Sequence, residues 1–185
     1  MDGSHHNAVH VALLGDSIFD NSAYTNGQAD VVTHLSGLLS PDGTATLLAA
    51  DGSTTTDVVR NQIGNLAADV THAAVSMGGN DAILHADLMD LPVDSTREAL
   101  TMFSDRVAEF ETNYRRALNA ISDRVPQTAV CTIYNVNLPG YEEDRALGRR
   151  SARSGRPTHA CQPDIRLLVR QARAYPSRRL MTFTG

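Results

Sequence analysis

The sequence predicts a single α/β domain in which helices cover both faces of a parallel sheet, a three-layer α/β/α sandwich. Two observations lead to this prediction. Short, continuous apolar runs, typical of strands buried on both faces, alternate with segments whose apolar residues recur at helical spacing. No linker or internal repeat interrupts the alternation, and 185 residues are enough for one domain with a sizeable core. The connections between strands are then expected to be right-handed crossovers.

The first half of the chain contains two strand–helix units. Residues 9–14 form the first apolar run, and apolar residues at helical spacing follow over residues 31–39. Proline and glycine in Ser40–Gly43 end that helix in a turn. Residues 44–50 predict the second strand, and residues 58–66 predict one face of the second helix.

The second half continues the alternation to the fourth strand. It contains a strand, a short helix, a long helix and a strand, over residues 71–77, 81–91, 95–126 and 128–136. The long helix gives the strongest signal, because its apolar residues step by threes and fours along one face. Ser95 and Glu98 at its start have the spacing of a capping box, which predicts where the helix begins.

Three of the four predicted strands end in small polar clusters, Gly-Asp-Ser, Asp-Gly-Ser and Gly-Gly-Asn-Asp. In open α/β sheets, chemistry collects beyond the carboxyl ends of the strands. Ser17 offers a hydroxyl, Gly52 an unshielded backbone N–H and Asn80 a side-chain amide. One hydroxyl with converging N–H donors is what acyl transfer needs, because attack on a carbonyl puts negative charge on its oxygen.

Each of these residues also has a plainer interpretation. Ser17 and Asn80 can cap the helices that follow them, and Gly52 can serve only as a turn glycine. Any one of them alone would favour that interpretation. All three in order, each after a predicted strand, favour a catalytic site.

The sequence predicts no metal and no cofactor. Asp16, Asp20 and Asp81 have the chemistry of metal ligands, but we interpret them as residues that order loops and cap helices. Cys131 and Cys161 are too few and too far apart for a zinc site or a disulfide framework. Cys131 lies in an apolar run and is expected to be a small buried hydrophobe.

The polar clusters also carry a resemblance to a known family. The stretches LLGDSIFDN, ADGSTT and SMGGNDA resemble, in order and spacing, the first three sequence blocks of the SGNH hydrolases, the GDSL-type esterases and lipases. The resemblance covers Val9 to about Gly140, and it implies a flavodoxin-like three-layer fold and hydrolysis of esters. It further implies that Ser17 is the catalytic nucleophile. The oxyanion hole would be formed by the N–H of Ser17, the N–H of Gly52 and the side chain of Asn80.

The fourth block of that family, Asp-x-x-His near the C-terminus, is missing from the corresponding part of this chain. The block supplies the general base and the carboxylate that orients it. His159 is the only histidine in this region, and Arg156 stands where the motif has aspartate. Although Asp164 is close in sequence, we do not carry the family role onto His159. The fold is therefore expected to be incomplete at its C-terminal end.

The charge of the chain changes abruptly near its end. The net charge is −5, yet residues 145–185 contain ten of the sixteen arginines and only one acidic residue, Asp164. We therefore divide the chain into a hydrolase-like domain, residues 1–147, and an arginine-rich tail, residues 148–185. A frameshifted or truncated reading frame is the favoured origin of the tail, and a true basic docking segment is the alternative. A tail of foreign origin would be disordered and would leave the fourth strand without a neighbour.

These features predict a serine ester hydrolase that forms an acyl-enzyme on Ser17 and is impaired here by loss of its base. The alternative is a non-catalytic binding domain that keeps the pocket and docks through the basic tail. The expected partner is a small-molecule ester, not a nucleic acid. No apolar run approaches the roughly 20 residues that span a bilayer, and the N-terminus does not resemble a secretory signal. We therefore expect no membrane association and a cytoplasmic location.

Overall fold

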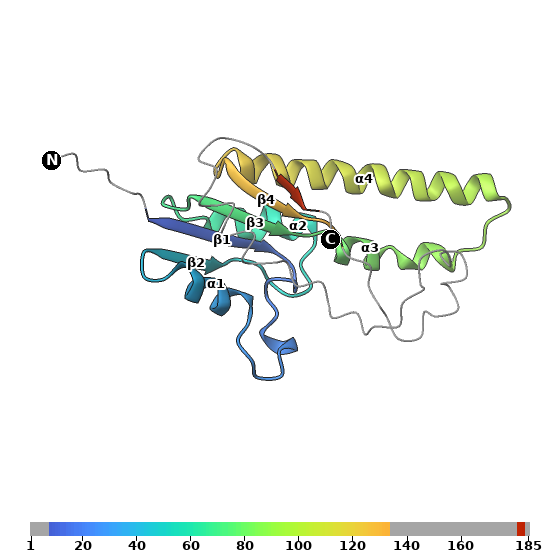
Figure 1. Cartoon of the computed structure of the whole chain (residues 1–185). Coiled ribbons are helices and arrows are strands. Elements are labelled where there is room, and N and C mark those ends of the chain that lie inside the picture. The colour runs from blue at the N-terminus through green and yellow to red at the C-terminus, as the bar shows by residue number, and fades with distance from the viewer. Residues whose placement is uncertain (1–7, 134–180, 184–185) are drawn as a thin grey trace.

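The computed structural model describes residues 8–133 and 181–183, and its centre is a parallel five-stranded sheet of order β2-β1-β3-β4-β5 (Figure 1). The strands are β1 (Val9–Gly15), β2 (Gly43–Leu47), β3 (His72–Ser76), β4 (Gln127–Cys131) and β5 (Met181–Phe183). Every pairing in this sheet is parallel. The carboxyl ends of β1, β2 and β3 therefore share one edge.

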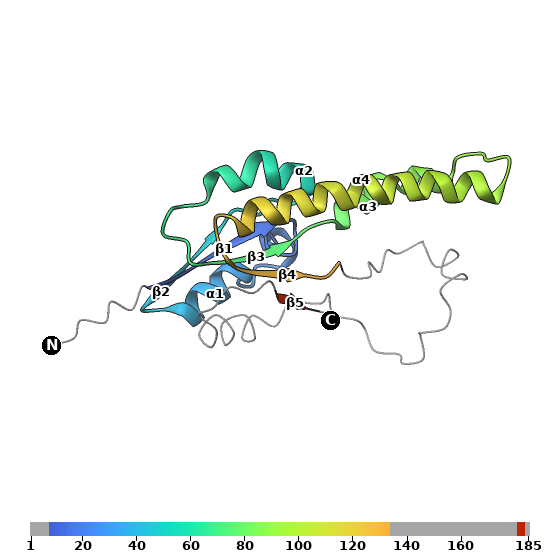
Figure 2. The same ribbon diagram turned by 90° about the horizontal axis from the view of Figure 1, so that it is seen from above.

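Helices cover both faces of the sheet, so the predicted three-layer α/β architecture is confirmed. The α-helices are α1 (Val31–Leu39), α2 (Thr55–Asp57), α3 (Gly79–Leu84) and α4 (Thr96–Ser122). A π-helical turn (Val58–Gln62) and 3-10 turns at Ser22–Tyr24, Ile63–Asn65 and Ala86–Met89 complete the helical segments. Figure 2 shows α1 on one side of the sheet and both α2 and α4 on the other. None of the helices within residues 8–133 is long and apolar enough to cross a membrane.

The core lies on both sides of β1, as its continuous apolar run predicts. Ala12 and Leu14 belong to a buried cluster that includes Ile121 of α4. Val11 and Leu13 belong to a second cluster on the opposite face, which α1 covers. Successive residues of a strand point to opposite faces, so a strand covered on both sides must be apolar at every position.

The long helix begins where the capping signal predicts. The Ser95 hydroxyl accepts a hydrogen bond from the Glu98 N–H at 3.2 Å. The Glu98 carboxylate accepts in turn from the N–H of Asp94 at 2.8 Å, one residue earlier than in a standard capping box. One N–H group that the helix itself leaves unpaired, that of Glu98, is thereby satisfied, together with the N–H of the residue before the N-cap.

Two predicted elements differ from the structure in ways that affect the site. The second strand ends at Leu47, and the expected residues 48–50 instead form a connection that hydrogen-bonds to β1, with Ala49 N–H donating to the Leu13 carbonyl at 2.9 Å. The second helix starts at Thr55 and contains a π-helical turn, in which Ile63 N–H donates to the carbonyl of Val58. An apolar pattern cannot reveal either change, because both depend on where backbone hydrogen bonds go.

The prediction that the fourth strand would lack a neighbour is wrong. Residues 181–183 form β5, and Ala129 to Cys131 of β4 align with them in parallel register. A short strand of β-branched and apolar residues is enough to pair the edge groups of β4. Cys131 is half-buried and packs against the cluster on the α1 side. The remainder of the arginine-rich tail lies outside the described residues, as do His159, Asp164 and Cys161.

Candidate functional site

The turn after β1 depends on a glycine. Gly15 has a φ of +119°, and a Cβ added there would lie 1.6 Å from the carbonyl oxygen of Ser76. Without a side chain at this position, the next residue can approach β3, and the Asp16 N–H donates to that same Ser76 carbonyl at 2.9 Å. The ends of β1 and β3 are therefore joined directly before Ser17.

Asp16, and not Ser17, orders this turn. Its carbonyl accepts hydrogen bonds from the N–H groups of Phe19 and Asp20, both at 3.1 Å, and its carboxylate accepts from the Ile18 N–H at 3.1 Å. Ser17 is half-buried in the same turn, and no hydrogen bond within residues 8–133 engages its hydroxyl. The interpretation of Ser17 as a helix cap therefore has no support in this geometry.

The Asp16 carboxyl group is itself perturbed. Burial raises its pKa above the usual range, and hydrogen bonds from Ile18 and Ser76 partly oppose that rise. The nearby charge of Asp81 acts in the same direction as burial. A carboxylate after β3 thus affects the pKa of a carboxyl group after β1 at this edge of the sheet.

The loop after β2 is tied to the turn after β1. The Asp51 N–H donates to the Asp20 carboxylate at 2.9 Å, and the Tyr24 hydroxyl donates to the Asp51 carboxylate at 2.6 Å. Gly52 follows with a φ of +77° and nothing within 4 Å of its missing Cβ. Its backbone borders an open hollow of about 320 Å³, to which Asn61 and other residues contribute. The N–H of Gly52 is consequently not shielded by any side chain of its own.

Gln62 connects the loops after β1 and β2 through hydrogen bonds of its side chain. It was not among the residues predicted for the site. Its side chain is only 3% exposed. It accepts from the Gly15 N–H at 2.8 Å, donates to the Gly15 carbonyl at 2.8 Å, and donates to the Ser53 hydroxyl at 3.2 Å. A polar residue within an otherwise apolar helical pattern was the one available signal.

The loop after β3 completes the linkage. The Asn80 side-chain amide donates to the Ser53 carbonyl at 3.0 Å. The neighbouring Asp81 carboxylate accepts from both the N–H and the hydroxyl of Thr55, at 3.0 and 2.6 Å. Asn80 does not cap α3, because Gly78, with a φ of +108°, occupies the cap position. Since an amide group carries two N–H bonds, the Ser53 carbonyl fixes its orientation and leaves the second N–H for another acceptor.

The three predicted loops are thus joined into one network at the carboxyl edge of the sheet. Asp20 binds the second loop to the first, and Asn80 and Asp81 bind the third loop to residues that follow the second. The expectation that Asp16, Asp20 and Asp81 order loops is confirmed by these hydrogen bonds. Within the described ranges, no three acidic, histidine or cysteine side chains are grouped so that they could hold a metal ion.

The described histidines do not include one that hydrogen-bonds to Ser17. Asp-x-x-His spacing occurs twice outside the C-terminal region, at Asp2–His5, which lies outside the described residues, and at Asp69–His72, where β3 begins at the histidine. The second pair therefore lies at the amino edge of the sheet, opposite Ser17. His85 follows α3 and lines a cavity together with Asp81, so it is the described histidine on the same side as the loop network.

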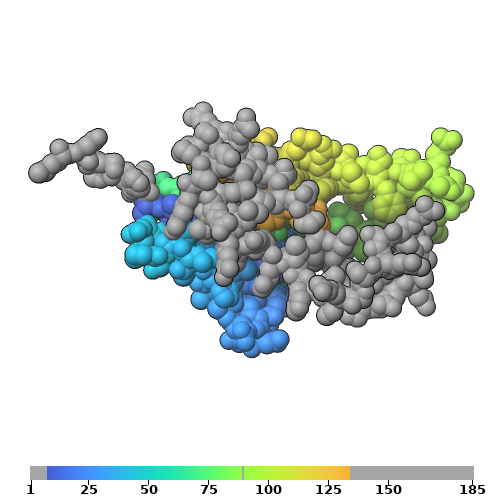
Figure 3. All heavy atoms as spheres, in the orientation of Figure 1, coloured from blue at the N-terminus to red at the C-terminus, as the bar shows by residue number. Residues whose placement is uncertain are grey.

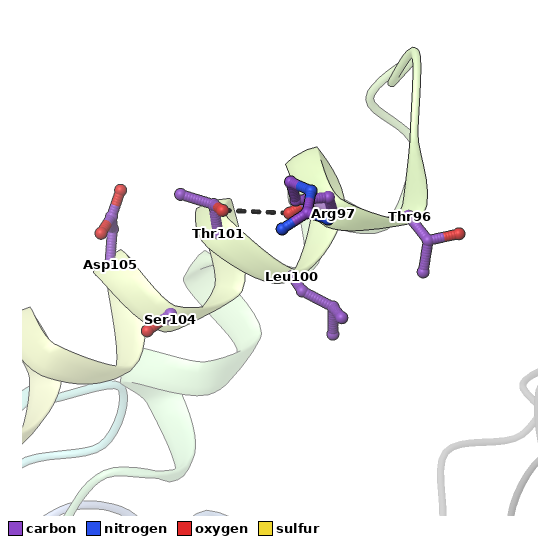
Figure 4. Close-up of a pocket in the computed structure, with 6 residues that line it drawn as sticks. All are labelled: Thr96, Arg97, Leu100, Thr101, Ser104 and Asp105. Carbon is purple, nitrogen blue, oxygen red and sulfur yellow. Dashed lines mark hydrogen bonds between the residues drawn. The ribbon is translucent and has the colours of Figure 1, made fainter.

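A shallow hollow on the first turns of α4 has no connection with this network (Figure 4). The hollow has a volume of about 530 Å³, and all six residues that line it belong to α4, including Arg97 and Asp105. The hydrogen bond drawn there, from the Thr101 hydroxyl to the Arg97 carbonyl at 3.0 Å, lies within the helix. This end of α4 projects away from the sheet (Figure 1), so the hollow is a feature of the helix surface.

Solved structures with a similar fold are lipases and esterases. The lipase Lip_vut3 from a goat rumen metagenome superposes with a TM-score of 0.50 at 14% identity, over 69% of this chain and 65% of that one. An extracellular lipase from Streptomyces rimosus gives 0.47 at 19% identity, over 75% and 69% of the two chains. Phospholipase A1 from Streptomyces albidoflavus NA297 gives 0.47 at 21% identity, over 71% and 63%. At these identities the likeness demonstrates the α/β fold alone.

In sequence comparisons, no protein-family model and no curated protein matches the chain.

Proposed function

We propose that this chain is a serine ester hydrolase of the SGNH, or GDSL, type. Ser17 is the nucleophile, and the oxyanion hole consists of the N–H groups of Ser17 and Gly52 and the side-chain amide of Asn80. The observation that carries the proposal is the 3.0 Å hydrogen bond from Asn80 to the carbonyl of Ser53, which ties the third loop to the residue after Gly52. The fold similarity to lipases and esterases supports the same class of reaction.

In the proposed reaction, the Ser17 oxygen attacks the ester carbonyl carbon while a base accepts the hydroxyl proton. Negative charge then develops on the carbonyl oxygen, where preorganised N–H donors stabilise it most. The tetrahedral intermediate expels the alcohol, which takes up the proton, and leaves an acyl group on Ser17. Water attacks this acyl-enzyme in the same way and releases the carboxylic acid.

Two features suit the site to this role. The Ser17 hydroxyl has no hydrogen bond to another residue of 8–133, so it is available to a substrate and a base. The Asn80 amide is held by Ser53 before any substrate arrives, so no reorganisation is needed when charge develops. Asp16 supports the turn from within, through its hydrogen bonds to Ile18 and Phe19.

The alternative function is a non-catalytic binding domain that retains the same pocket. The observation that favours it is the position of the Asp69–His72 pair, at the edge of the sheet opposite Ser17. A positioned general base contributes about 10²–10⁴-fold to the rate, so a chain without one would bind esters and scarcely hydrolyse them.

A fluorophosphonate probe tests the assignment of the nucleophile. Given a base that activates its hydroxyl, as in the protein read in a frame that encodes Asp-x-x-His after Leu147, the probe should label Ser17, and Ser17→Ala should abolish labelling. Ser53→Ala and Ser76→Ala are matched controls, because both serines are buried beside the same turn and should not react. Peptide mapping that finds the label on another serine would contradict the proposal.

Ester turnover separates the enzyme from the binding domain. We expect near-background hydrolysis of p-nitrophenyl acetate by the 185-residue chain, and a Ser17-dependent increase when the gene is read in a frame that encodes Asp-x-x-His after Leu147. If the 185-residue chain turns over at the rate of the reframed protein, and Ser17→Ala removes that activity, a base such as His159 is already present. If no reading frame encodes the motif and turnover stays at background, the binding domain is the better description.

A further inference from the structure

An apolar cavity of about 310 Å³ adjoins the first turn of α3, which carries Asn80. It lies between α4 on one side and α3 with the following 3-10 turn on the other. In the space-filling view, green atoms of the segment that includes α3 lie beneath the yellow-green surface of α4 (Figure 3). Its apolar walls come from both sides and from the end of β4, and include Phe103, Val107, Phe110, Ala82, Leu88 and Ile133.

The cavity and the proposed oxyanion donor share one short segment of chain. Gly78 and Asp81, which flank Asn80 in sequence, both line the cavity. A Cβ at Gly78 would lie 2.8 Å from Cδ1 of Ile133 and 3.0 Å from Cζ of Phe110, so these two side chains lie close to the Gly78 backbone. The apolar walls therefore extend to within two residues of Asn80.

The charged groups at the cavity already have partners. The Asp81 carboxylate is engaged by Thr55, and the Arg106 guanidinium lies 3.2 Å from the Glu109 carboxylate. Both groups therefore have a polar partner other than a ligand in the cavity. His85 is the other polar side chain in the lining. A neutral hydrocarbon ligand fits this lining better than an acidic or basic one, because burying an unpaired polar group is costly.

We propose that this cavity binds the acyl chain of the ester, so that esters of medium-length fatty acids, of about eight to twelve carbons, are preferred over acetyl esters. This inference rests on the proposed function. The volume lies at the lower end of the range of small-molecule sites. An acetyl group would leave most of the apolar wall in contact with water, whereas a longer chain covers it. Val107 is 60% exposed and Phe103 41%, so the cavity is open along α4 and a chain can enter from the side.

The proposal is tested by binding, which requires no turnover. Calorimetric titration of the Ser17→Ala protein with hexanoate, octanoate, decanoate and dodecanoate, below their micellar concentrations, should give affinities that rise about two- to fourfold for each added methylene. Val107→Trp, which fills the cavity, should weaken dodecanoate binding at least tenfold. Leu100→Trp is the matched control, because Leu100 is exposed on the same helix and does not line this cavity.

Three results would overturn the proposal: no dodecanoate binding, affinity independent of chain length, or equal losses in Val107→Trp and Leu100→Trp. The first would mean that something other than an acyl chain occupies the cavity. Circular dichroism of both variants checks that they fold alike. Failure of the proposed function is distinguished separately, since it appears as loss of Ser17 labelling while fatty-acid binding by the Ser17→Ala protein persists.

Discussion

The two ends of the sheet carry the same kinds of polar side chain but differ in backbone. At the amino edge, the Asp69 carboxylate lies 3.1 Å from Nδ1 of His10, and Nε2 of His10 lies 2.7 Å from the Thr46 hydroxyl. A carboxylate, an imidazole and a hydroxyl are therefore in contact in the order that a catalytic triad uses. At the carboxyl edge, Ser17 and Asn80 lie in turns joined by hydrogen bonds between loops.

The arrangement of N–H donors, more than the types of residue present, distinguishes the two edges of the sheet. Thr46 lies within β2, an extended strand whose N–H groups point alternately in opposite directions and cannot converge on one oxygen. The carboxyl edge has three glycines with positive φ: Gly15 ends β1, Gly52 follows β2 and Gly78 follows β3. Positive φ turns the chain sharply, so that backbone and side-chain N–H groups from separate loops can meet.

The largest expected effect comes from adding a side chain at Gly15, in the turn after β1. Gly15→Ala should lower the free energy of unfolding by about 3–5 kcal/mol, because the new Cβ would overlap the Ser76 carbonyl. Gly27→Ala is the control, with a positive φ of +80° but nothing within 4 Å, and should cost about 1–2 kcal/mol. Urea unfolding measures both. Equal losses would mean that the contact with Ser76 does not constrain the turn.

Next in size is the catalytic effect of the Asn80 amide. In a full-length homologous protein that hydrolyses esters, Asn80→Ala should lower the rate about 10²–10³-fold, with little change in KM, because the donor acts on charge present mainly in the transition state. The measurement is turnover or, where turnover is slow, the rate of fluorophosphonate labelling. Thr46→Val, at the amino edge, should leave that rate unchanged. An effect of Asn80→Ala on KM alone would assign Asn80 to substrate binding.

A smaller effect on stability should come from the buried amide of Gln62. Gln62→Leu would leave the N–H and the carbonyl of Gly15 without their partner, at a cost of about 2–3 kcal/mol in the free energy of unfolding. Thr46→Val removes one part-buried hydrogen bond at the other end and should cost about 1 kcal/mol. Chemical denaturation of the two variants gives the comparison. A Gln62→Leu protein as stable as Thr46→Val would show that the loops do not depend on Gln62.

The smallest effects concern pH, and the two ends should respond in opposite directions. Burial raises the pKa of Asp16, so folding disfavours its charged form, and the protein should gain stability as pH falls through that pKa. Contact with His10 lowers the pKa of Asp69, so its contribution is present above the usual aspartate pKa and is lost as pH falls through the lowered one. The first of these changes in stability with pH should disappear in Asp16→Asn, and the second should disappear in Asp69→Asn. Unfolding of each variant at several acidic pH values measures this. If the stability contributions of Asp16 and Asp69 changed in the same direction as pH falls, the opposite pKa shifts assigned to these two residues would be contradicted.

Local periodicity predicted most of the fold. The apolar run of β1 and the stepped apolar face of α4 are signals contained in adjacent residues, and both elements form where predicted. The meeting of the three loops was also predictable, because parallel strands place their carboxyl ends at one edge. What the pattern missed depends on contacts between distant residues. β5 forms from three residues whose only signal is local alternation, and it pairs with β4 across some fifty residues of sequence.

The residues proposed for the site could be chosen from the sequence, but the contacts that hold them in place could not be predicted. The sequence shows directly which functional groups are offered by Ser17, Gly52 and Asn80. The capping role of Asp16 in place of Ser17 depends on the direction in which the turn leaves β1, and that direction is set by Gly15 against Ser76. The Asn80–Ser53 hydrogen bond likewise depends on the relative height of two loops, for which a sequence has no local signal.

The π-helical turn at Val58–Gln62 restricts the number of residues that this segment of the chain can contain. The Ile63 N–H bonds to the carbonyl five residues earlier, so this turn holds one residue more than an α-helical turn. Deleting a single residue such as Asn61 would allow regular helix, but would rotate the preceding side chains by about 100° relative to those that follow and turn the glutamine away from Gly15. The exposed turn at Asn26–Gly27 has no such link, so natural variants of this protein should gain or lose residues there while the 55–65 segment keeps its length.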